Sequence, residues 1–137
     1  MTKYLSIDIG GTNVKYAELN ESVDVIAKGK VKTEHNLDDF LAEIDQIVDK
    51  FQADGLSGIA FCAPGKIEDT TIRFGGALPF LDGVDFAKRY EKLGLPVAVV
   101  NDGKASALAE SWLGSLQGVK NGAAIVLGTG VGGGIIV

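Results

Sequence analysis

Three short segments at the start of the chain have the alternating, β-branched pattern of strands, and only a few turn residues separate them. They run from Tyr4 to Ile9, from Val14 to Leu19 and from Val23 to Val31. Strands so close in sequence pair antiparallel, because a parallel pair needs a crossover of a dozen or more residues. This N-terminal segment is therefore predicted to be a three-stranded antiparallel meander.

The hydrophobic period changes after residue 36. Apolar side chains recur three and four residues apart from Leu37 to Phe51, as on one face of a helix, and Asn36 or Asp38 can cap its start. Two continuous apolar segments, Leu56 to Ala63 and Pro96 to Val100, have the length and composition of strands. Because both segments are almost entirely apolar, they are expected to be buried on both faces.

Shorter elements lie between and after these strands. We expect irregular extended chain at Ile67 to Phe74, a short helix at Val84 to Leu93 closed by Gly94, a further helix at Lys104 to Leu113, and a strand at Ala123 to Leu127. Strands that alternate with helices pair in parallel. The predicted fold class is α/β, with a mixed sheet of three antiparallel strands followed by parallel strand–helix units.

The composition narrows the class of protein. The chain of 137 residues is 46% apolar and 23% charged with a net charge of −5, as in an ordinary globular domain. A nucleic-acid surface would carry a basic stripe, so no nucleic-acid partner is expected. The single cysteine, Cys62, excludes an internal disulfide and a multi-cysteine zinc site. Without a leader or an apolar stretch of about 20 residues, we expect a cytoplasmic protein with no membrane partner.

Residues 8–13, DIGGTN, form a glycine-rich turn between two strands. A dinucleotide loop or a P-loop leads from a strand into a helix, so neither motif fits. A glycine hairpin still binds phosphate when its backbone N–H groups approach the anion, and Gly10, Gly11 and Thr12 are the candidates. Lys15 would add a positive charge, and Asp8 would hold Mg²⁺ through water. The alternative is a tight turn without a ligand.

A second glycine-rich turn lies near the end of the chain. Residues 128–134, GTGVGGG, follow the apolar segment AAIVL and precede IIV. Gly128, Thr129 and Gly130 are therefore candidates for a second phosphate hairpin, so that a nucleotide would be held from two sides. A flexible glycine linker is the alternative, although linkers rarely stand between two apolar segments.

Asn101 and Asp102 follow an apolar strand and precede a predicted helix. Ligands of such sheets bind at the carboxyl ends of parallel strands. Asp102 can accept the proton of a substrate hydroxyl that attacks a γ-phosphate. Helix capping is the alternative role, because Asn and Asp are the preferred N-cap residues.

Four segments together resemble the motifs of ROK-family (repressor, ORF, kinase) sugar kinases. They are DIGGTNVK at 8–15, GIAFCAPG at 58–65, VVNDGKASALAE at 99–110 and GTGVGGGIIV at 128–137. The resemblance spans the chain in order, and implies an actin-like (ribonuclease H-like) fold and ATP-dependent phosphorylation of a hexose, as in glucokinases. It also implies that Asp102 is the catalytic base, that Asn101 binds a sugar hydroxyl, and that the two glycine turns bind the phosphates of ATP.

The chain departs from the family pattern at two places. Lys104 stands where a second Asn is usual, and Gly75-Gly76-Ala77 replaces the proline–asparagine pair that contacts the sugar. Gly76 is kept as a candidate sugar contact. Both changes affect the identity of the sugar, while the base and the phosphate turns are retained.

The resemblance also implies a second lobe that this chain lacks. We expect residues 1–118 to be the N-terminal lobe and residues 119–137 to be the opening hairpin of the second. A lone apolar hairpin exposes an edge, so it is expected to pair with another chain or to fold back, and a homodimer is the expected assembly. The chain alone is expected to have little or no kinase activity.

Three other functions compete with a kinase. A transcriptional repressor of the same family would carry a helix-turn-helix before the first phosphate turn, where this chain has seven residues. A non-catalytic sugar-sensing module would not need Asp8, Thr12 and Asp102. An acyl-CoA dehydratase activator, another actin-like ATPase, would need iron–sulfur cysteines.

Overall fold

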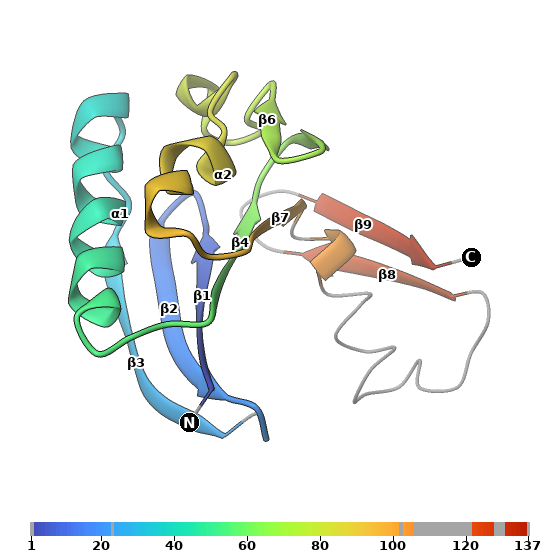
Figure 1. Cartoon of the computed structure of the whole chain (residues 1–137). Helices are drawn as coiled ribbons and strands as arrows, with labels where there is room; N and C mark the ends of the chain where they lie inside the picture. Colours follow the sequence, from blue (N-terminus) through green and yellow to red (C-terminus); the bar gives the residue numbers. More distant parts are fainter. Residues whose placement is uncertain (1, 23, 102, 106–121, 128–130, 137) are drawn as a thin grey trace.

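The computed structural model describes residues 2–22, 24–101, 103–105, 122–127 and 131–136 (Figure 1). Its centre is a five-stranded mixed sheet in the order β3-β2-β1-β4-β7. The strands are β1 Lys3–Ile9, β2 Asn13–Asn20, β3 Val25–Lys32, β4 Gly58–Ala63 and β7 Val97–Asn101. The first three pair antiparallel, and β1, β4 and β7 run parallel. This is the predicted mixed sheet, and the expected α/β class is confirmed.

The helices α1 (Leu37–Gln52) and α2 (Phe86–Arg89) cover the same face of the sheet. Tyr16 of β2 and Phe61 of β4 both lie opposite Ile7 of β1, so their side chains share one face. The Tyr16 ring meets a ring of α1, and the Phe61 ring stacks on Phe86 of α2 with centroids 4.1 Å apart. Right-handed crossovers that progress in one direction across a sheet require this arrangement.

The packed face forms the hydrophobic core, and its residues alternate along β1 with those of the other face. Leu5, Ile7 and Ile9 are fully buried, whereas Asp8 between them is exposed. Helix α1 begins where the sequence predicts: the side chain of Asn36 accepts the Asp39 N–H at 2.9 Å. Of the two candidate caps, Asn36 is therefore the one used.

The expectation that β4 and β7 are buried on both faces is wrong for the described part of the chain. Ala60 and Ala98 are exposed on the face opposite the helices. The two strands look uniformly apolar because that face carries small side chains, not because a second layer of described residues covers it.

Residues 66–73 form a hairpin, not the irregular extended chain that the sequence suggests. Strand β5 (Lys66–Glu68) pairs antiparallel with β6 (Thr71–Arg73) beyond the end of β4 (Figure 1). Short single-turn helices follow: the 3₁₀ turn η1 (Pro79–Leu81), then α2, then the 3₁₀ turn η2 (Glu91–Leu93). The expected single helix at 84–93 is thus two short pieces, and it ends at left-handed Gly94 (φ 69°) as predicted.

The two helices are joined by one polar cluster. Arg89 donates two hydrogen bonds to the carboxylate of Asp45 in α1, at 3.0 and 2.7 Å. The hydroxyl of Tyr90 donates a third to the same carboxylate at 2.7 Å. Burial raises the pKa of Asp45, but these donors and the Arg89 charge outweigh it and hold that pKa below its usual value.

Near the end of the chain, β8 (Gly122–Leu127) and β9 (Val131–Ile136) pair antiparallel and form a sheet of their own. A strand–turn–strand unit is what the sequence predicts here. The proposed boundary between the lobes, at residues 114–122, and most of the predicted helix at 104–113 lie outside the described residues.

Candidate functional site

The carboxyl ends of the three parallel strands are in register, which places the candidate site residues along one edge. Asp8 of β1 lies opposite Cys62 of β4, which lies opposite Val100 of β7. Asn101 is one residue further along β7. With about 4.8 Å between neighbouring strands, the backbones of Asp8 and Asn101 are roughly 10 Å apart. The first phosphate turn and the Asn101 position therefore share one edge of the sheet.

The turn at residues 10–12 is a tight hairpin between β1 and β2. The N–H of Gly10 donates to the carbonyl of Asn13 at 3.0 Å, and a Cβ on Gly10 would lie 2.8 Å from that carbonyl oxygen. Only glycine fits at this close approach. The N–H groups of Gly11 and Thr12 have no acceptor among the described residues, so they can donate to an anion.

Thr33, which directly follows β3, holds this turn in place with two hydrogen bonds. Its hydroxyl donates to the carbonyl of Gly10 at 2.7 Å, and its N–H donates to the carbonyl of Thr12 at 3.0 Å. Thr33 is almost completely buried. The sequence gives no signal for this role, because the contact joins residues 23 positions apart.

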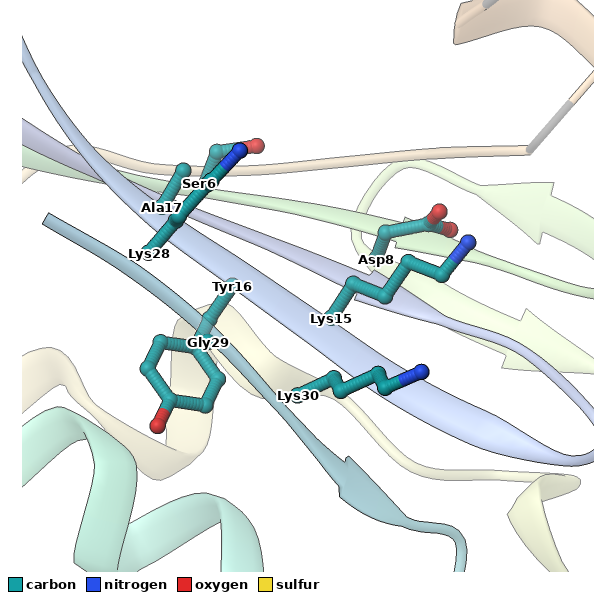
Figure 2. Close-up of a pocket in the computed structure, with 8 residues that line it drawn as sticks. All are labelled: Ser6, Asp8, Lys15, Tyr16, Ala17, Lys28, Gly29 and Lys30. Atoms are coloured by element: carbon teal, nitrogen blue, oxygen red, sulfur yellow. The ribbon is translucent and has the colours of Figure 1, made fainter. Parts of the chain in front are cut away.

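Asp8 and Lys15 are direct cross-strand partners on the face of the sheet opposite the helices. Figure 2 shows the Asp8 carboxylate and the Lys15 ammonium group on the same side of the strands, with Lys30 of β3 beside them. Together with Lys28 they line an open hollow of about 490 Å³. Three ammonium groups and one carboxylate make its lining net positive. Lys15 thus lines this hollow, whereas residues 10–12 of the glycine turn do not, and its role toward phosphate stays a prediction.

Asn101 is held by hydrogen bonds on both sides of its amide. Its Nδ2 donates to the carbonyl of Gly65 at 2.6 Å, and its Oδ1 accepts the N–H of Gly103 at 2.9 Å. The second bond joins the Asn101 side chain to the backbone two residues on, as in an Asx-turn, directly before a helical segment at 103–105. Capping of that segment, the alternative role that the sequence offers for this pair, stays a prediction. One N–H and one lone pair of the amide stay available for a ligand.

The backbones of Gly65 and the Gly75-Gly76 pair pack closely against each other beside Asn101. A Cβ on Gly65 would lie 2.8 Å from the nitrogen of Gly75, and one on Gly76 would lie 3.1 Å from the nitrogen of Gly65. All three have positive φ, at 94°, 75° and 56°. Candidate sugar contact Gly76 is therefore brought next to the loop that holds Asn101.

Several predicted site residues lie outside the described residues. They are Asp102, the candidate base, and Gly128, Thr129 and Gly130 of the second phosphate turn. Within the described ranges, no three His, Cys, Asp or Glu side chains gather as a metal site. No helix there is long and apolar enough to cross a membrane.

Comparisons with known proteins agree with this architecture. The chain is 36% identical to a glucokinase of Halalkalibacterium halodurans over 144 residues, covering 97% of this chain and 43% of that protein. It is 33% identical to an N-acetyl-D-glucosamine kinase of Photobacterium profundum over 141 residues, covering 97% of this chain and 46% of that protein. The chain thus spans about half the length of these curated relatives.

Among solved structures, it is similar to a ROK family glucokinase from Streptomyces griseus in complex with glucose and AMPPNP. The TM-score is 0.84 at 27% identity, over 98% of this chain and 44% of that one. The family model described as "ROK family" matches residues 4–137. This chain belongs to the ROK family and has the actin-like fold of its sugar kinases.

Proposed function

We propose that this chain is the N-terminal lobe of an ATP-dependent hexose kinase. One observation carries the proposal: the turn after Asp8, where the N–H groups of Gly11 and Thr12 have no acceptor among the described residues, shares a sheet edge with Asn101. A separation of roughly 10 Å suits a terminal phosphate at one end and a sugar hydroxyl at the other. The relatives' glucokinase and N-acetylglucosamine kinase activities support the hexose class.

The residues at the phosphate end suit a phosphate group that binds together with a divalent cation. The two free N–H groups and the positive lining around Lys15 attract phosphate oxygens. A single exposed carboxylate, Asp8, fits Mg²⁺, which is commonly bound through one or two carboxylates, retained waters and the phosphates themselves. The bound metal would neutralise charge on the phosphates. Thr33, by fixing the turn, keeps its donors in place before the nucleotide binds.

At the acceptor end, Asn101 orients the sugar and Asp102 removes a proton. The remaining amide N–H and lone pair of Asn101 can bind one hydroxyl. Asp102, the next residue, accepts the proton of the attacking hydroxyl, and the hydroxyl oxygen forms its bond to the γ-phosphorus as the bond to ADP breaks. Gly76, the candidate sugar contact, packs on Gly65, whose carbonyl accepts the Asn101 amide.

Residues 119–137 are assigned to the second lobe, with Gly128, Thr129 and Gly130 as the second set of phosphate donors. Closure of that lobe would exclude water from the phosphate. A homodimer is part of the same proposal, with the β8–β9 hairpin as a candidate contact, because no other described strand pairs with either edge of this sheet.

The test uses the protein as its gene encodes it. Hexoses, including glucose and N-acetylglucosamine, are screened for sugar-dependent ATP consumption with Mg²⁺ present. Asp102→Ala should lower kcat by about 10²- to 10⁴-fold, the usual contribution of a general base. Asp54→Ala, at an exposed position after α1, is the matched control and should leave kcat unchanged. No consumption with any sugar, or full turnover by the Asp102 variant, would reject the proposal.

A further inference from the structure

Phe74 is the most exposed large apolar residue in the described part of the chain. Its side chain is 74% exposed, against 55% for Val25 and 44% for Tyr4. It follows β6 and directly precedes the Gly75-Gly76 pair. A phenylalanine that gains little from burial in its own domain leaves an aromatic ring available to a ligand.

The backbone conformation at Phe74 is also strained. Its φ is 67°, in the left-handed region that bulky residues rarely adopt. Glycine would occupy that conformation without strain, and the next two residues are glycines with φ of 75° and 56°. Strained positions of this kind persist where the surrounding structure fixes them, and they cluster at ligand sites.

The surrounding contacts fix Phe74 at the acceptor end of the site. Its N–H donates to the carboxylate of Asp82 at 2.9 Å. Immediately after it, Gly75 and Gly76 pack on the backbone of Gly65, whose carbonyl accepts the Asn101 amide. Phe74 is thus within two residues of the contact that joins its loop to the sugar-binding asparagine.

We propose that Phe74 is a specificity residue that contacts the apolar ring face of the acceptor hexose. The inference rests on the proposed kinase function and names a further part of its acceptor site. Sugar sites combine a few polar groups with apolar and aromatic lining. Here Asn101 supplies the polar contact, and Phe74 supplies an aromatic surface in a segment where this chain has Gly76-Ala77 in place of a side-chain amide.

The test compares two glycine substitutions in the protein as its gene encodes it. Phe74→Gly removes the ring and relieves a left-handed φ. Asp69→Gly relieves a similar φ of 56° in the β5–β6 turn and is the matched control for backbone strain. Phe74→Tyr keeps the aromatic ring. The hexoses of the activity screen are titrated into each variant by calorimetry without nucleotide, and ATP is titrated separately.

We expect Phe74→Gly to bind the preferred hexose about three- to tenfold more weakly, which corresponds to the loss of one aromatic contact. Its Tm should not fall, its affinity for ATP should not change, and KM for the sugar should rise while kcat is retained. Phe74→Tyr should bind within about twofold of the unmodified protein, since the ring surface is kept, and Asp69→Gly should bind equally well.

Unchanged sugar affinity in Phe74→Gly would overturn the inference. A lower Tm together with weaker binding of both sugar and ATP would also overturn it, because the loss would then come from the fold and not from one sugar contact. Failure of the kinase proposal looks different: the unmodified protein would bind a hexose without consuming ATP, and the Phe74 comparison would still decide this contact. If no hexose binds at all, both are rejected.

Discussion

Gly75→Ala tests the packing that brings the acceptor loop to the sheet edge. Gly75 is buried and has φ of 75°. A Cβ there would lie 2.1 Å from the carbonyl oxygen of Leu78, far inside van der Waals contact. That part of the chain cannot move freely, because the N–H of Leu78 donates to the carbonyl of Gly75 at 2.9 Å. The alanine variant must therefore distort the loop.

The matched control is Gly83→Ala. Gly83 has a similar φ of 88°, but nothing lies within 4 Å of a Cβ at that position. The left-handed conformation costs alanine about 1–2 kcal/mol, and about 0.4–1 kcal/mol returns through the stiffer unfolded chain. Gly83→Ala should thus lower the free energy of unfolding by roughly 1 kcal/mol.

Gly75→Ala carries the same backbone cost plus the overlap with a carbonyl. Overpacking in a rigid site adds about 1–3 kcal/mol. The expected difference between the two variants is therefore about 2 kcal/mol, or roughly 1 M in the urea midpoint for an m-value near 2 kcal/mol/M. Urea unfolding of this chain, followed by far-UV circular dichroism, measures it. Equal midpoints for the two variants would refute the described packing of the loop.

Two further predictions concern the phosphate turn and the helix layer. Thr33→Val removes the hydroxyl that donates to the Gly10 carbonyl but keeps the side-chain shape, and it should lower the free energy of unfolding by about 1–2 kcal/mol. In urea titrations, Thr33→Ser should recover part of this loss. Equal stability of the parent, the Val variant and the Ser variant would contradict a stabilising role for this hydrogen bond. Asp45→Asn should lose about 1–2 kcal/mol at pH 7. The folded pKa of Asp45 is lowered, so its stabilisation is complete above the unfolded pKa of about 4 and disappears as pH falls through the lower folded value. Urea midpoints of the Asn variant and the parent should therefore converge as the pH falls below the unfolded pKa and through the lower folded one, and a gap that is constant with pH would contradict the prediction.

The sheet and its main helix could be predicted because their signals are local. The turn of two glycines between alternating strands indicated an antiparallel hairpin, and the three–four spacing after Asn36 indicated α1 to within one residue at its end. Long periodic elements encode their type in their own residues.

The β5–β6 hairpin and the exposed face of β4 could not be predicted for opposite reasons. Strands of three residues are too short to show alternation, so residues 66–73 looked irregular. Ala60 and Ala98 are apolar at exposed positions, so apolar content overstated burial. In both cases the structure depends on a neighbouring element: the partner strand for residues 66–73, and the lack of a described covering layer for Ala60 and Ala98.

The candidate site divides in the same way. Asp8, the glycine turn and Asn101 were identified by residue type at strand ends, and the structure places them along one edge. Thr33 and Gly65 were missed, because their contacts join distant segments. A bond from Thr33 to Gly10, or from Asn101 to Gly65, has no counterpart in sequence spacing.

The proposed kinase function depends most on one arrangement: the turn at Gly10–Thr12 and the Asn101–Asp102 pair serve the two ends of one phosphoryl transfer. A crystal structure of the protein as its gene encodes it, with its preferred hexose and a non-hydrolysable ATP analogue, tests this directly. We predict that the N–H groups of Gly11 and Thr12 donate to phosphate oxygens while a sugar hydroxyl contacts both Asn101 and Asp102. Phosphates bound away from this turn, or a sugar bound away from the carboxyl end of β7, would contradict the account.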